Sequence, residues 1–254
     1  KAREIYYSLP SPLETSRMLK VSGARFSSDM LHNTEESKNY TTSRAKALNL
    51  GIYLADLSYC NVFHRQQQCI DYFAVTKDLG DGLGMSQVFT NEALDRVNEN
   101  LNNQDSVFRI LSELYWKAND EMKENQLKSV NARVMAGLWI EGMHIGLNSY
   151  ASAKEKKDIL RQRIVEQQFV LNELLPMIAS MNTDDDLDAI VNDLANVQAI
   201  FDKFKVDEEE PIIMEGEDGN AGIGGDVEVS ADDSLIEELA ATIATIRKKY
   251  TSQA

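Results

Sequence analysis

Proline, cysteine and histidine are all scarce in this chain. Its 254 residues include 4 prolines, 2 cysteines and 3 histidines. So few prolines argue against a fold of short strands joined by many turns, where proline is common. Two cysteines in a chain of this length do not make a disulfide framework. We interpret Cys60 and Cys69 as separate buried thiols; the alternative is that they face each other across a helical hairpin that turns near His64.

Positive charge is also in short supply. The chain has 26 basic and 41 acidic side chains, a net charge of −15. Such a chain repels the phosphates of nucleic acids and of anionic lipid headgroups, so we predict no nucleic-acid partner. The densest basic stretch, residues 154–163, is interrupted by Glu155 and Asp158 and is typical of a solvated helix face.

Long apolar runs are missing as well. No run approaches the ~18–20 residues that a membrane-spanning helix needs, and the most apolar stretch, residues 134–147, carries Glu141 and His144. We therefore predict no transmembrane segment in this chain. The motifs of nucleotide-binding loops are absent. Residues 218–229 also lack the glycine and the final glutamate that an EF-hand requires.

Apolar residues recur instead at intervals of three and four, which indicates helices with a buried stripe. We predict an all-α fold, a bundle of about eight helices. Capping residues place several starts, with Ser11, Asp105 and Ser234 in favourable positions. The predicted helices cover residues 12–22, 42–63, 65–80, 87–101, 105–124, 127–150, 152–181 and 183–204, and a last one begins near Ser234.

The predicted domain organisation has three parts. Residues 1–205 form the helical domain, with residues 12–124 and 127–204 as its two candidate halves. Residues 206–231 are predicted to be an acidic, glycine-containing loop, because residues 207–218 hold seven acids and no base. A loose cation site in that loop is an open alternative. Residues 232–254 are predicted to form a C-terminal helix that packs on the body.

Two segments of the chain look alike, residues 45–59 and residues 136–150. Four positions are identical, namely Ala45/Ala136, Gly51/Gly142, Ser58/Ser149 and Tyr59/Tyr150. We interpret the pair as an internal duplication of a multi-helix unit. The alternative is that helical periodicity alone produces such matches. Gly142 and Gly146, like Gly51 and Ala55, have a spacing that lets a neighbouring helix approach closely, so we predict close helix contact there.

Five residues of these two segments form the only constellation that suggests a site: Tyr53, Asp56, Trp139, Glu141 and His144. The interpretation we favour is a structural polar network, since buried polar groups need partners. A ligand pocket with aromatic walls is the alternative. Glu141 and His144 have the Glu-x-x-His spacing of di-metal bundles, but those need a second such pair, and Tyr53 stands where His144 would have its match. We therefore predict no catalytic residue, no metal and no cofactor.

Three stretches resemble a known family. They are SLPSPLE (residues 8–14), YTTSRAKALNLGIYLADLSY (residues 40–59) and GLWIEGMHIGL (residues 137–147). They are similar to a family of uncharacterised exported bacterial proteins that are often predicted to be lipoproteins, and the resemblance covers most of residues 5–205. It implies a periplasmic or cell-envelope location, a signal segment removed ahead of Lys1 and a lipid anchor upstream of it. It transfers no functional residues, and it does not include residues 206–254.

Together these features predict a non-enzymatic cell-envelope protein that acts by binding or scaffolding. One alternative is a small-molecule-binding protein with a pocket near the paired helices 42–63 and 127–150. The other is a metal-dependent enzyme that uses Glu141 and His144.

Overall fold

The computed structural model describes residues 24–124, 127–155, 157–181, 185–207, 212–215, 221–224, 228–230 and 232–252. The predicted helix 12–22 and its cap Ser11 lie outside these residues. In the described part the all-α bundle is confirmed. The helices are α3 (Ser43–Val62), α4 (Gln66–Gly82), α5 (Asn91–Glu99), α6 (Gln104–Glu124), α7 (Lys128–Ser152), α8 (Lys157–Ser180), α9 (Asp185–Phe201) and α10 (Asp233–Thr251). Two short 3-10 helices, η1 (Ser28–Met30) and η2 (Thr34–Asn39), precede α3.

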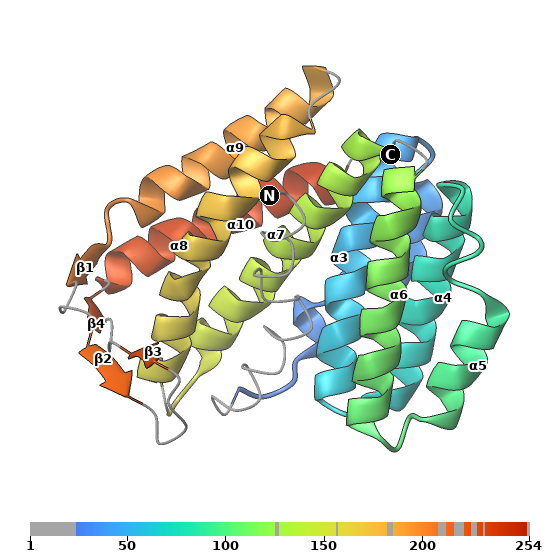
Figure 1. Ribbon diagram of the computed structural model, residues 1–254, viewed down its shortest axis with the longest axis horizontal. Helices are drawn as coiled ribbons and strands as arrows, with labels where there is room; N and C mark the ends of the chain where they lie inside the picture. Colours follow the sequence, from blue (N-terminus) through green and yellow to red (C-terminus); the bar gives the residue numbers. More distant parts are fainter. Residues whose placement is uncertain are drawn as a thin grey trace.

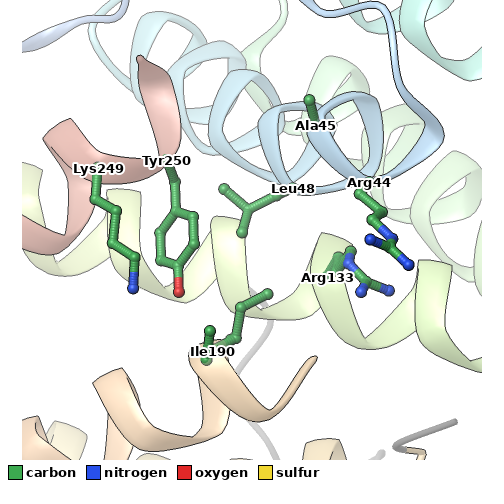
Figure 2. Close-up of a pocket in the computed structure, with 8 residues that line it drawn as sticks. Arg44, Ala45, Leu48, Arg133, Ile190, Lys249 and Tyr250 are labelled. Carbon is green, nitrogen blue, oxygen red and sulfur yellow. The ribbon is translucent and has the colours of Figure 1, made fainter. Parts of the chain in front are cut away.

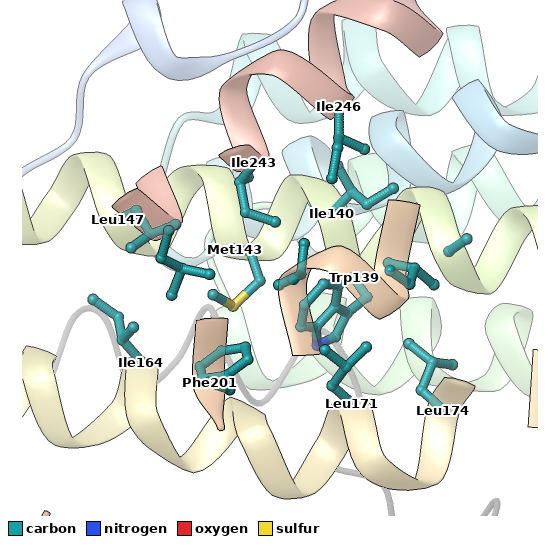
Figure 3. Close-up of a cluster of buried hydrophobic side chains, with 14 of the residues drawn as sticks. Trp139, Ile140, Met143, Leu147, Ile164, Leu171, Leu174, Phe201, Ile243 and Ile246 are labelled. Atoms are coloured by element: carbon teal, nitrogen blue, oxygen red, sulfur yellow. The ribbon is translucent and has the colours of Figure 1, made fainter. Parts of the chain in front are cut away.

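Helices α3 to α6 gather on one side of the molecule and α8 to α10 on the other, with α7 running between them (Figure 1). The buried apolar residues divide in the same way. One cluster joins α3 to α4, α5 and α6, and the other joins α7 to α8, α9 and α10. In the second cluster, Trp139 and Met143 of α7 meet Leu171, Phe201 and Ile243 of three other helices (Figure 3). Helices α3 and α7 contribute residues to both clusters, so the fold is built around them.

The segment predicted to be an acidic loop contains four short strands. They are β1 (Lys205–Asp207), β2 (Ile212–Glu215), β3 (Ala221–Gly224) and β4 (Glu228–Ser230). Strand β1 pairs with β4 and β2 pairs with β3, both antiparallel. The prediction weighed the acids and glycines and overlooked the β-branched residues, which favour strands. The cation site proposed for this segment depends on side chains outside the described residues.

Side-chain caps explain where the helices begin. The Thr42 hydroxyl accepts a hydrogen bond from Ala45 N at 3.1 Å, so α3 starts within one residue of its predicted position. Helix α5 starts at Asn91 rather than at 87 because Thr90 caps it. The predicted cap Ser234 was wrong. Asp232 caps α10 by accepting from Ser234 N, also at 3.1 Å.

The central helices touch backbone to backbone at two glycines. A Cβ atom added at Gly51 would lie 2.1 Å from the Val134 carbonyl oxygen, and one added at Gly137 would lie 2.0 Å from the Leu48 carbonyl oxygen. Both distances are far below van der Waals contact, so only glycine fits at the crossing of α3 and α7.

The predicted close contact at Gly142 and Gly146 was wrong. A Cβ atom added at either glycine meets no described atom within 4 Å. The crossing therefore pairs Gly51 with Gly137, whereas the look-alike alignment pairs Gly51 with Gly142. This mismatch removes the best-aligned glycines as support for the proposed duplication, which the structure does not confirm.

We expect Gly51→Ala to lower the free energy of unfolding by at least about 1–3 kcal/mol, because its methyl group would collide with the α7 backbone. Gly142→Ala is the matched control, since there is room for the methyl group and alanine favours the helix by about 1 kcal/mol. Urea unfolding of both variants measures the difference. Equal stability of Gly51→Ala and the native protein would contradict the backbone contact.

Candidate functional site

Two buried carboxyl groups and one guanidinium form the centre of the candidate site. Asp56 of α3 and Glu141 of α7 are both 0% exposed. Arg247 of α10 donates from Nε and Nη2 to the two carboxylate oxygens of Glu141, at 2.5 and 2.8 Å. Asp56 Oδ2 accepts a hydrogen bond from His32 N at 3.0 Å. The crossing of α3 and α7 thus brings together three ionisable groups from three helices.

The charges of this cluster do not balance if both acids are ionised. Burial raises the pKa of Asp56 well above its usual range, and the neighbouring Glu141 charge raises it further. Burial also raises the pKa of Glu141, but the bidentate bond and the charge of Arg247 oppose that shift. Glu141 is therefore the ionised partner of Arg247, and Asp56 holds the proton. Asp56 Oδ1 is buried and has no hydrogen-bond donor among the described residues; when it carries the proton it can donate to Glu141, which lies within hydrogen-bonding reach.

Residues 24–42, which we call the strap, lie over this cluster and are held by backbone hydrogen bonds and by the buried side chains of Met30, His32 and Tyr40. The Tyr53 and Tyr72 hydroxyls each donate at 2.8 Å, to the carbonyl oxygens of Asn33 and His32. The Tyr59 hydroxyl donates to the carbonyl oxygen of Arg25 at 3.2 Å. Tyrosines of α3 and α4 therefore fix the path of the strap across the bundle.

The strap is also joined to the end of α10. Tyr40, at the C-terminal side of η2, donates to the Thr251 carbonyl oxygen at 3.0 Å, and its hydroxyl lies 2.6 Å from His32 Nε2. Arg247 Nη2 lies 3.5 Å from the Met30 carbonyl oxygen. Burial, followed by the Arg247 charge, lowers the pKa of His32 to about 4, so the ring is neutral near pH 7.

Three of the five predicted site residues come together here. Tyr53, Asp56 and Glu141 belong to one polar network. Trp139 does not, because it stands two residues from Glu141 and so points to another side of α7, into the apolar cluster of Figure 3. His144 lies at the edge of this network: it bonds to the Met30 backbone of the strap and lies close enough to Arg247 to feel its charge, and its Nδ1 is 3.2 Å from Asn148 Nδ2. Burial and then the Arg247 charge lower the pKa of His144 to about 4.

Sequence reasoning missed Arg247, the cation of the site. The run Arg247–Lys249 lies at the C-terminal end of the last helix, where positive charge is favourable in any case, so its position alone does not indicate a buried partner. A signal was available, since two carboxyl groups on largely apolar helices need a buried cation or a proton. Arg247 directly follows Ile246 in the apolar stripe of the last helix, which places it near the core.

The described residues contain no group of three or more His, Cys, Asp or Glu side chains that could hold a metal ion. Glu141 uses both of its oxygens on Arg247. The two cysteines are free and buried, as predicted. Burial raises the pKa of the Cys69 thiol to about 12 and that of the Cys60 thiol further, which makes both unreactive near pH 7.

A pocket of about 180 Å³ lies between α3, α7, α9 and α10. Leu48 and Ile190 form apolar walls, Arg44 and Arg133 lie together at one end, and Lys249 and Tyr250 lie at the other (Figure 2). Lys249 Nζ is 2.7 Å from Asp193 Oδ2, an oxygen that also accepts from the Tyr250 hydroxyl at 2.5 Å. This pocket adjoins the paired helices, as the alternative prediction required, but none of the five predicted residues lines it.

No protein-family model, curated protein or solved structure matches this chain. None of the described helices is long and apolar enough to cross a membrane. The resemblance to exported bacterial proteins and the location that it implies therefore stay predictions.

We expect Glu141→Gln to lower the free energy of unfolding by about 3–5 kcal/mol, because it leaves the Arg247 charge buried without its counter-ion. The control is Glu113→Gln, which breaks the surface pair of Arg96 and Glu113, both 50% exposed, and should change stability by at most about 1 kcal/mol. Chemical unfolding at neutral pH compares the two. Similar small losses in both variants would contradict the assignment of Glu141 as the ionised, buried partner.

Proposed function

We propose that this chain is a non-enzymatic protein of the cell envelope that acts by binding or scaffolding. The observation that supports this is the enclosure of the polar cluster of Asp56, Glu141 and Arg247 in the part of the chain that the structure describes. Asp56 and Glu141 have no exposed surface, and their oxygens face the strap and Arg247. Groups enclosed in this way stabilise a fold but do not contact a substrate. The envelope location rests on the sequence resemblance alone.

An enzyme based on Glu141 and His144, the alternative, would need the side chain of His144 for its reaction. In such an enzyme the imidazole would take part in the chemistry, whereas in the proposed function it only helps to hold the Met30 backbone of the strap. His144→Asn separates the two readings, because Asn148 offers a hydrogen-bond partner to either side chain.

We expect a gene that encodes His144→Asn to complement a strain in which the native gene is deleted, as well as the native gene itself does. Thermal unfolding of the purified variant is the control for folding, and fractionation of the same cells tests for the envelope location. A variant with native stability that fails to complement would contradict a non-enzymatic role. Recovery of the native chain in the cytosolic fraction would contradict the location.

A second candidate is a small-molecule-binding protein, and the pocket of Figure 2 favours it. At about 180 Å³ the pocket is smaller than sites for drug-sized ligands, which start near ~300 Å³. Apolar walls beside the end with Arg44 and Arg133 fit a small compound with an aliphatic middle and an acidic end, such as a short-chain carboxylate; Lys249 at the other end is paired with Asp193.

We expect a short-chain carboxylate such as butyrate to raise the melting temperature of the native protein if this pocket is its site. A ligand at 100 times its Kd adds about 2.7 kcal/mol. Ala189→Leu narrows the pocket from its exposed rim and should abolish the shift. Ala199→Leu, exposed on the same helix, should leave it unchanged. No shift in the native protein, or equal shifts in both variants, would rule out this site for carboxylates.

A further inference from the structure

One cation serves two fully buried acids at the crossing of α3 and α7. Arg247 forms a bidentate ion pair with both oxygens of Glu141. Among the described residues, Asp56 has one hydrogen-bond donor, the backbone N–H of His32. An ionised Asp56 would be a second buried negative charge facing Glu141 with no cation of its own. Burying an uncompensated charge costs several kcal/mol, so protonation of Asp56 stabilises the folded chain.

The same cluster holds two separate parts of the chain in place. The strap is bonded to Asp56 through His32 and to Arg247 through the Met30 carbonyl oxygen. Helix α10 is bonded to Glu141 through Arg247, and its end is bonded to the strap through Tyr40 and Thr251. Weakening of the Asp56–Glu141 contact therefore acts on the strap and on α10 together.

We infer that Asp56 and Glu141 share one proton in the folded protein, and that its loss releases the strap and the end of α10 from the bundle. The shared proton acts as a latch, by which we mean that the strap and the end of α10 stay on the bundle while Asp56 is protonated and donates to Glu141. When Asp56 loses the proton, two carboxylates repel each other across the seam where the strap, α7 and α10 meet. Among the described residues of α4 and α5, only Tyr72 hydrogen-bonds to the strap, at the His32 carbonyl oxygen, so these two helices remain folded.

The other titratable groups around Asp56 do not change charge between pH 6 and 9. Burial raises the pKa of Tyr53 and Tyr72, which adjoin Asp56 from α3 and α4, and that of Cys60, on its own helix. From the strap and α7, His32 and His144 have a pKa lowered to about 4. Arg247 of α10 stays charged, and Glu141 is held ionised against it. Asp56, whose pKa is raised by burial and by the Glu141 charge, is therefore the group of this cluster whose protonation differs between the folded and the unfolded chain.

The sign of the pH effect follows from the raised pKa of Asp56. The folded chain keeps the proton at pH values where the unfolded chain has lost it. The stabilisation is complete below the unfolded pKa of about 3.9, and it falls as pH rises until the folded pKa is passed. Over that range the unfolding equilibrium constant rises by up to about tenfold per pH unit for this one proton.

The test compares the full-length native protein with Asp56→Asn, which keeps the shape, can donate to Glu141 and cannot ionise. Urea unfolding from pH 6 to 9 should show the native unfolding constant rising relative to that of Asp56→Asn, by up to about tenfold per pH unit. Asp202→Asn, an exposed aspartate after α9, is the matched control and should follow the native curve. Parallel curves for the native protein and Asp56→Asn would overturn the shared proton.

Amide hydrogen exchange over the same pH range tests the release itself. After correction for the intrinsic exchange rate, His32 and the residues around Thr251 should lose protection with rising pH before α4 does, and Asp56→Asn should keep them protected. Simultaneous loss along the whole chain would overturn the latch. If Asp56→Asn fails to fold, infrared spectroscopy of the native protein decides the matter, because a protonated carboxyl band must be present at neutral pH; its absence would overturn the proposal.

Discussion

The contact of the α3 and α7 backbones at Gly51 and Gly137 is the constraint on which the rest of the structure depends. Two helices that approach this closely bury nearly all of their side chains, including those that a looser bundle would leave in water. Asp56 and Glu141 are buried for this reason. Once they are inside, the fold must supply a cation and a proton, and the position of α10 and the path of the strap follow from those two needs.

The pairing of Glu141 with Arg247 also has a role that apolar packing cannot perform. Isoleucine and leucine on α10 would pack acceptably against α7 in more than one register, since apolar contacts have little directionality. A bidentate guanidinium–carboxylate pair has one good geometry, and a misplaced Arg247 would leave two charges buried without partners. The pair therefore gives α10 a single position, although its net contribution to stability is small.

Much of the fold could be predicted from the sequence, because apolar spacing and capping residues are local signals. Most of the described helices begin and end within a few residues of their predicted limits; the largest differences at a helix start are at α8, which begins at Lys157 rather than 152, and at α5, which Thr90 caps. The candidate site was harder to predict. Tyr53, Asp56 and Glu141 were found because polar residues stand out on apolar helices. Trp139 was included as an aromatic wall of a possible pocket, although its spacing of two from Glu141 places it on another side of the helix.

The errors share one physical cause: they concern which residues meet across the bundle. Gly137 and Gly142 both stand in the apolar stretch 134–147, and only the position of the crossing shows which of them touches α3. Arg247 is 106 residues from Glu141, so no local pattern connects them. Strands β1 and β4 likewise depend on pairing between residues 205–207 and 228–230, which composition does not reveal.

The way the strap is fastened has a consequence for how the protein can change over time. Tyrosine hydroxyls hold it by bonding to the carbonyl oxygens of Arg25, His32 and Asn33, and Asp56 holds it through the backbone N–H of His32. Every residue type has a carbonyl oxygen, so the exposed side chains of the strap, unlike the buried Met30, His32 and Tyr40, can be replaced without loss of these bonds. The recognition lies in the helices, where Tyr53, Tyr59 and Tyr72 cannot be replaced without losing a donor. The strap is therefore a region where new surface chemistry can arise while the bundle beneath it stays the same.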